Sequence, residues 1–178
     1  KKMINPIINE VTKMSDALDE NEVNEYIKCL IPHLASPSVE IIGLAAGRMG
    51  YALRSFIMRL SHMGFNASMI GDTNVPRVKK ESIVFVNSSS GETPTILLYT
   101  QQASAMKPVI FSTTCNIESS IGLMSNFCIT MPTISSSQLM KSPYEQFSML
   151  LYDYIIIKLM ESLNLDSSKV SANHSILE

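Results

Sequence analysis

A cluster of hydroxyl side chains lies in the segment 88–93, which reads SSSGET and holds four hydroxyls and one glycine. It follows an apolar run at 82–87 and precedes Pro94, a residue favoured at the first position of a helix. The first backbone N–H groups of a helix lack intrahelical partners and lie at the positive end of its dipole. The segment therefore predicts a phosphate site built from Ser88, Ser90, Gly91 and Thr93. The alternative is that these residues are ordinary turn and cap residues.

A second loop at 45–50 reads AAGRMG and follows the apolar run at 39–44. Its Gly47 suits a tight turn, and Arg48 can neutralise a phosphate or hold a sugar hydroxyl. The alternative is that Arg48 is a solvent-exposed residue of the turn with no binding role. The loop lacks the first glycine of G-x-G-x-x-G, and no G-x-x-x-x-G-K-[ST] occurs in the chain, which argues against a dehydrogenase or an ATPase.

Three further side chains are candidates for proton transfer, namely Glu145, His62 and His174. Glu145 precedes a long apolar segment, where an acid also stabilises its own helix through the dipole. His62 lies near the end of an amphipathic segment, where a lone histidine is often a packing residue. His174 lies in a polar tail, and such tails are usually frayed.

Composition limits the classes of protein and of partner. The chain has 178 residues, which suits one domain over 1–178, and its net charge of -2 supplies no basic field for nucleic acid or anionic lipid. The three cysteines, Cys29, Cys115 and Cys128, show neither a disulfide framework nor metal-ligand spacing. The most apolar stretch, 149–160, is interrupted by charges and is too short to span a membrane, and the amino end lacks a secretory signal. We therefore expect a cytoplasmic protein with no metal site.

These residues must be positioned by elements that the apolar patterns predict. Helical spacing indicates helices at 4–18, 23–31, 51–63, 94–106 and 142–163, and short apolar runs indicate strands at 39–44, 67–70, 82–87, 109–113 and 127–131. Strands separated by helices predict an α/β fold, a three-layer parallel sheet preceded by two amino-terminal helices. In such sheets ligands bind at the carboxyl ends of the strands, where both loops lie.

The motifs together resemble the sugar isomerase (SIS) domain family, and within it the 6-phospho-3-hexuloisomerases. That group carries G-A-G-R-S-G, M-R-L-x-H-L-G-F, G-E-x-x-x-P, S-G-S-G-E-T, a glutamate at the start of the last long helix, and a terminal R-H-x-N-L-E. The matching residues here are Gly47, Arg48 and Gly50; Met58, Arg59, Leu60, His62, Gly64 and Phe65; Gly71 and Pro76; Ser88, Ser90, Gly91, Glu92 and Thr93; Glu145; and His174, Leu177 and Glu178.

The resemblance implies a doubly wound, flavodoxin-like sheet of five strands, assembly into dimers or tetramers, and isomerisation of a phosphorylated ketose without metal or cofactor. It implies Glu145 as the base, with His174 reaching a site made with a neighbouring subunit. The chain departs from the family at Ala45, Met49 and Ser89, where the family has glycine, a phosphate-binding serine and glycine.

The activity expected from the resemblance is the interconversion of 3-hexulose 6-phosphate, the adduct of formaldehyde and ribulose 5-phosphate, with fructose 6-phosphate through an enediol(ate). This is a step of the ribulose monophosphate pathway. One alternative is a noncatalytic SIS module that senses a sugar phosphate or serves as an assembly subunit, which Met49 and Ser89 would permit. Another is a related isomerase of arabinose 5-phosphate or a heptose 7-phosphate.

Overall fold

The computed structural model of the chain describes residues 3–36 and 38–174. Its strands are β1 (Glu40–Ala45), β2 (Asn66–Met69), β3 (Ile83–Asn87), β4 (Val109–Thr114) and β5 (Phe127–Thr130). Its helices are α1 (Asn5–Ala17), α2 (Glu20–His33), α3 (Gly47–His62), α4 (Pro94–Ser104), α5 (Ser120–Met124), α6 (Ser142–Ser162) and α7 (Ser167–Ala172). None of the described helices is long and apolar enough to cross a membrane.

The strands form one parallel sheet of five strands in the order β2-β1-β3-β4-β5, which confirms the predicted fold class. The chain moves outward from β1 to β2 and then returns to the other side of β1 to form β3. The strand order therefore reverses between β1 and β3, where Ala45 pairs with Asn87 at the carboxyl ends. A crevice at such a reversal is the usual ligand site of an open α/β sheet.

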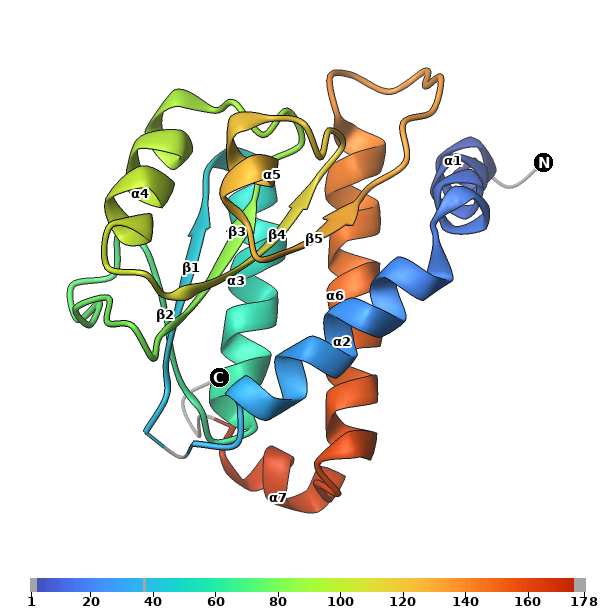
Figure 1. Cartoon of the computed structure of the whole chain (residues 1–178). Helices are drawn as coiled ribbons and strands as arrows, with labels where there is room; N and C mark the ends of the chain where they lie inside the picture. The colour runs from blue at the N-terminus through green and yellow to red at the C-terminus, as the bar shows by residue number, and fades with distance from the viewer. Residues whose placement is uncertain (1–2, 37, 175–178) are drawn as a thin grey trace.

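Helices cover both faces of the sheet (Figure 1). On one face α2, α3 and α6 enclose a large apolar core, and on the other α4 and α5 enclose a smaller one. Strand β3 is buried along its whole length because its side chains alternate between the two cores, Phe85 entering the first and Val84 and Val86 the second. Helix α1 packs on α6 at the outer side of this layer.

Several expected boundaries were wrong. Helix α3 begins at Gly47 rather than Tyr51, so most of the glycine loop is already helical. Helix α2 continues through Pro32 to His33, two residues beyond the expected end at 31. The short helices α5 and α7 were not expected, because five or six residues are too few to show a helical period.

Candidate active site

The two loops singled out from the sequence meet where the strand order reverses. Each leads from a strand into a helix, the first from β1 into α3 and the second from β3 into α4. Asn87 Nδ2 donates to the backbone oxygen of Met49 over 3.4 Å, and the Ser89 backbone N–H donates to the Met49 sulfur, also over 3.4 Å. The amino ends of both helices therefore meet where the strand order reverses, with Met49 lying between the loops, and we call this edge of the sheet the crevice.

The second loop is held in shape by its own hydroxyls. Ser88 Oγ and Thr93 Oγ1 are 3.0 Å apart, and Ser90 Oγ accepts from the Glu92 backbone N–H over 3.1 Å. Ser88 is buried and Ser90 is exposed. Thr93 precedes α4 as predicted, but its side chain makes no capping hydrogen bond to that helix. The α4 amino terminus therefore keeps N–H groups that a bound anion can accept from.

Two glycines are required by the backbone of these loops. Gly47 has a φ of 57° and Gly91 a φ of 66°, values that residues with a side chain rarely adopt. A Cβ on Gly91 would also lie 1.9 Å from the Oγ of Ser119. Both positions thus fit the glycines of the family motifs for a local steric reason.

Glu92 could have repelled a phosphate, but its carboxylate is committed elsewhere. Its Oε1 accepts from the Ser120 backbone N–H over 2.6 Å, at the start of α5. This contact keeps the negative charge of the Glu92 carboxylate at the start of α5, beyond the end of the loop. The loop can therefore carry a glutamate and still present its own donors to an anion.

Glu145 and Arg48 form an ion pair beside the crevice. Helices α3 and α6 run side by side, which brings their first turns together (Figure 1). The Arg48 Nε contacts the Glu145 carboxylate. The arginine side chain is 65% exposed and the glutamate side chain 12% exposed, so the cation can swing into solvent or toward a ligand while the carboxylate stays in place.

A buried polar network lies beneath this pair, and sequence reasoning did not find it. The Tyr144 hydroxyl lies 2.7 Å from Asn87 Oδ1 and 2.9 Å from the Thr113 backbone oxygen, and the Tyr152 hydroxyl lies 2.9 Å from Thr113 Oγ1. Burial, followed by the nearby Tyr152, raises the pKa of Tyr144 well above its ordinary value, which keeps its hydroxyl a donor. Tyr144 thereby ties the first turn of α6 to the ends of β3 and β4. The available signal was a tyrosine directly before Glu145.

His62 and His174 lie together, away from Glu145. Helix α7 and the turn after it bring His174 back to the end of α3, where the two imidazole centroids are 4.9 Å apart. Asn173 Nδ2 also donates to the His62 backbone oxygen over 2.9 Å. Since His62 ends α3 and Arg48 lies in its first turn, the histidines lie roughly 20 Å from the ion pair at 1.5 Å per helical residue. Within one chain the structure therefore gathers Arg48, Glu145 and the two loops, and separately pairs the histidines.

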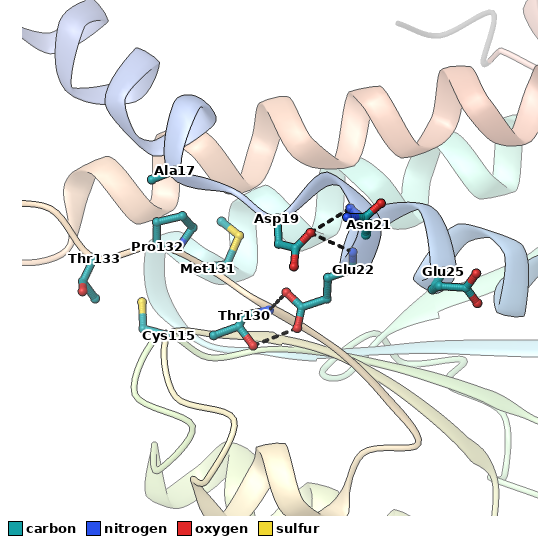
Figure 2. Close-up of a pocket in the computed structure, with 10 residues that line it drawn as sticks. All are labelled: Ala17, Asp19, Asn21, Glu22, Glu25, Cys115, Thr130, Met131, Pro132 and Thr133. Carbon is teal, nitrogen blue, oxygen red and sulfur yellow. Dashed lines mark hydrogen bonds between the residues drawn. The ribbon is translucent and has the colours of Figure 1, made fainter.

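A cavity of about 730 Å³ lies beside β5 rather than at the crevice (Figure 2). Asp19, Glu22 and Glu25 line it, together with Cys115 and the residues that follow β5. Glu22 accepts from the backbone N–H and the hydroxyl of Thr130, over 2.8 and 2.9 Å, and so fastens α2 to the sheet edge. The acidic lining of this cavity is unsuited to a phosphate.

Comparisons with known proteins identify relatives of this chain. The chain is 34% identical over 181 residues to the 3-hexulose-6-phosphate isomerase of Bacillus subtilis (strain 168), covering 97% of this chain and 95% of that protein. It is 29% identical over 136 residues to the 3-hexulose-6-phosphate isomerase of Methanocaldococcus jannaschii, covering 76% of this chain and 75% of that protein. No family model matches the chain.

Two solved structures share the fold. One is a hypothetical protein from Methanococcus jannaschii, for which the function of a 3-hexulose-6-phosphate isomerase was inferred from its structure. It superposes with a TM-score of 0.86 at 24% identity over 100% of both chains. A protein of E. coli CFT073, solved in complex with a sugar phosphate, gives a TM-score of 0.80 at 20% identity, covering 97% of this chain and 93% of that one. At these identities the likeness is one of fold.

Proposed function

The chain belongs to the 3-hexulose-6-phosphate isomerase family, and on that premise we propose that it interconverts 3-hexulose 6-phosphate and fructose 6-phosphate. At the level of reaction class it is a sugar-phosphate isomerase. The observation that supports the proposed isomerisation is that Glu145, Arg48 and the loop 88–93 converge at the point where the strand order reverses.

The reaction moves a carbonyl from C3 to C2 of the sugar and needs one base. Glu145 takes the proton from C2 of the 3-ketose, and the electrons form the 2,3-enediolate with its charge on O3. The proton of the C2 hydroxyl passes to O3, and the same carboxyl returns its proton to C3 as the carbonyl forms at C2. A carboxylate held on a rigid helix and largely shielded from water suits this task, since its oxygen keeps one position through both transfers.

The phosphate of the substrate binds the loop 88–93, with Ser88, Ser90, Gly91 and Thr93 as the proposed contacts. The exposed guanidinium of Arg48 leaves Glu145 and turns to the phosphate or to an oxygen of the enediolate. Exchanging one anionic partner for another keeps the arginine paired, and it frees the carboxylate to accept a proton. Substrate binding and activation of the base are in this way one event.

The proposed site is completed by a second copy of the chain. Helices α3 and α6 lie side by side and expose large apolar residues, namely Tyr51, Met58, Leu150, Tyr154 and Ile157. A surface of this kind is typical of an interface between subunits. We place the His62 and His174 pair of one subunit at the crevice of another, in a dimer or a tetramer, where an imidazole can polarise a sugar hydroxyl or open the ring.

Two contacts favour a second candidate, a module that binds a sugar phosphate without turning it over. The Met49 sulfur already occupies the Ser89 N–H, and Arg48 already holds Glu145. Both contacts must open before catalysis. A protein in which they stayed closed would bind its ligand at the rim of the crevice and leave the base unused.

A coupled assay separates the two candidates. Fructose 6-phosphate is supplied with the synthase that cleaves 3-hexulose 6-phosphate to ribulose 5-phosphate and formaldehyde, and formaldehyde is measured. The proposed isomerase produces formaldehyde in proportion to its concentration, and Glu145→Gln serves as the inactive control. Saturable binding of fructose 6-phosphate by calorimetry, with no formaldehyde and no exchange of deuterium from solvent, would assign the chain to the binding module instead.

A further inference from the structure

Glu10 is a buried carboxylate that the site described above does not use. It lies on α1 and is 8% exposed. An ionised carboxylate is costly to bury unless it is paired or hydrogen-bonded. None of the salt bridges among residues 3–36 and 38–174 involves Glu10, so donors must compensate its charge.

Those donors all belong to the segment between β5 and α6, whose residues 134–141 we call the strap. Ser136 Oγ donates to Glu10 Oε2 over 2.7 Å. The Ser137 backbone N–H and hydroxyl donate to Oε1 over 2.9 and 3.0 Å. Gln138 Nε2 donates to Oε2 over 2.8 Å. A single carboxylate thus holds three successive residues of the strap, which Figure 1 shows passing between α1 and the start of α6.

The strap passes this constraint to the first turn of α6. Gln138 and Gln146 form a reciprocal amide pair, with Gln146 Nε2 donating to Gln138 Oε1 over 2.8 Å and Gln138 Nε2 reaching Gln146 Oε1 at 3.2 Å. The strap ends at Lys141, whose backbone oxygen accepts the Glu145 N–H over 3.1 Å. Glu145 therefore lies between Tyr144, which the core network holds, and Gln146, which the strap holds.

We propose that Glu10 is a positioning residue for Glu145, acting through the strap residue Gln138 and the α6 residue Gln146. The inference rests on the proposed function in so far as Glu145 is the base. Tyr144 fixes the first turn of α6 from the core side, and the chain Glu10, Gln138 and Gln146 fixes it from the outer side. Through these contacts helix α1 helps to position the base, although it contributes no residue to the active site.

The test uses the direction of the hydrogen bonds. In Glu10→Gln the new amide N–H₂ faces either the N–H₂ of Gln138 or the backbone N–H of Ser137, so in both orientations the strap loses a contact and the pair with Gln146 is disturbed. We expect kcat to fall about tenfold while KM for fructose 6-phosphate stays within about twofold, since the phosphate loop is untouched. Asp16→Asn, an exposed carboxylate on the same helix, is the matched control and leaves both constants unchanged.

A reciprocal exchange provides the rescue. In the double variant, Glu10→Gln with Gln138→Glu, the new amide at position 10 donates to the new carboxylate at position 138. That carboxylate also accepts from the amide of Gln146, so the contacts between positions 10, 138 and 146 are restored with the donor and the acceptor exchanged. The double variant should recover most of the lost kcat. An unchanged kcat in folded Glu10→Gln, or a double variant no better than the single one, would overturn the proposal.

Two further measurements keep the test decisive. If Glu10→Gln fails to fold, Gln138→Met removes the link to Gln146 and leaves the serine contacts of Glu10, and it should show the same loss of kcat with unchanged KM. Hydrogen exchange gives a readout that needs no activity. Amides at 141–146 should exchange at least about fivefold faster in Glu10→Gln, while β4 amides keep the wild-type rate. Equal rates at 141–146 would reject the inference, whereas an inactive wild type with the predicted exchange would reject only the proposed function.

Discussion

The sulfur of Met49 accepts a hydrogen bond from the backbone N–H of Ser89 over 3.4 Å, and so joins the two loops of the crevice. A thioether is a weak acceptor, whereas a phosphate oxygen is a strong one. The sulfur therefore occupies the Ser89 N–H only weakly, and a phosphate oxygen can replace it. Met49 also has no hydrogen-bond donor in its side chain, whereas the family motif carries a serine at this position.

Met49→Ser should tighten the binding of fructose 6-phosphate. The smaller side chain uncovers the Ser89 N–H and adds a hydroxyl donor, and one added hydrogen bond corresponds to about a three- to tenfold lower Kd. Titration calorimetry measures the change. Met106→Ser, an exposed methionine just after the end of α4, is the control and should keep the wild-type Kd. An unchanged Kd in Met49→Ser would show that the first loop does not touch the ligand.

Ser90→Ala should weaken sugar-phosphate binding about three- to tenfold, because an exposed donor of the anion loop is lost. The hydroxyl also accepts from the Glu92 N–H, so the loop loses one internal contact as well. Ser104→Ala, at the opposite end of α4, is the comparison and should bind as the wild type does. The shift of melting temperature with added fructose 6-phosphate reports both. Equal shifts in Ser90→Ala and the wild type would place the phosphate elsewhere.

Glu145→Gln should lower kcat by about 100-fold or more with little change in KM, because the amide keeps the shape but cannot accept the proton. In heavy water the wild type should place solvent deuterium at C3 of fructose 6-phosphate, and the variant should not. Glu161→Gln, near the far end of the same helix, is the matched control. A variant that still exchanges deuterium at the wild-type rate would move the base to His62 or His174.

Two impaired variants should complement one another if the site is shared between subunits. His174→Ala removes the imidazole and Glu145→Gln removes the base, so a mixed oligomer contains some crevices with neither change. Co-expression of the two variants should restore a substantial part of the activity, and sedimentation should show an oligomer at micromolar concentration. A monomer, or a mixture no more active than its parts, would remove His174 from the site.

Glu10 should also stabilise the fold in a manner that depends on pH. Its hydrogen bonds, led by the Ser137 backbone N–H and followed by Gln138 and Ser136, lower its pKa from 4.5 to about 2. A lowered folded pKa gives stability that is present above pH 4.5 and is lost as the pH falls toward 2.

The difference in melting temperature between the wild type and Glu10→Gln should therefore be largest near neutral pH and shrink through this window. Asp16→Asn again supplies the control, measured over the same pH range. A difference that stayed constant down to pH 2 would mean that the carboxylate charge contributes nothing to these contacts.

The order of strands and long helices was readable because each depends on residues close in sequence. Buried strands such as β3 are apolar runs, and α6 is long enough for its apolar content to stand out. The elements that were missed, α5 and α7, are held by single capping side chains, Ser119 and Asp166, rather than by an apolar period. A cap of one residue looks the same in sequence as any polar turn.

The sequence by itself determined the parallel α/β fold, the two loops at the carboxyl edge, the resemblance to the sugar isomerases and Glu145 as a candidate base. Only the tertiary structure decided which polar groups meet, because hydrogen-bond partners are set by how elements pack and not by their spacing along the chain. Met49 and Ser89 are 40 residues apart, Tyr144 and Asn87 are 57 apart, and Glu10 and Ser137 are 127 apart. Glu10 illustrates the reason. On an isolated amphipathic helix it belongs to the solvated face, and it becomes buried and structural only when a strap from the far end of the chain folds over it.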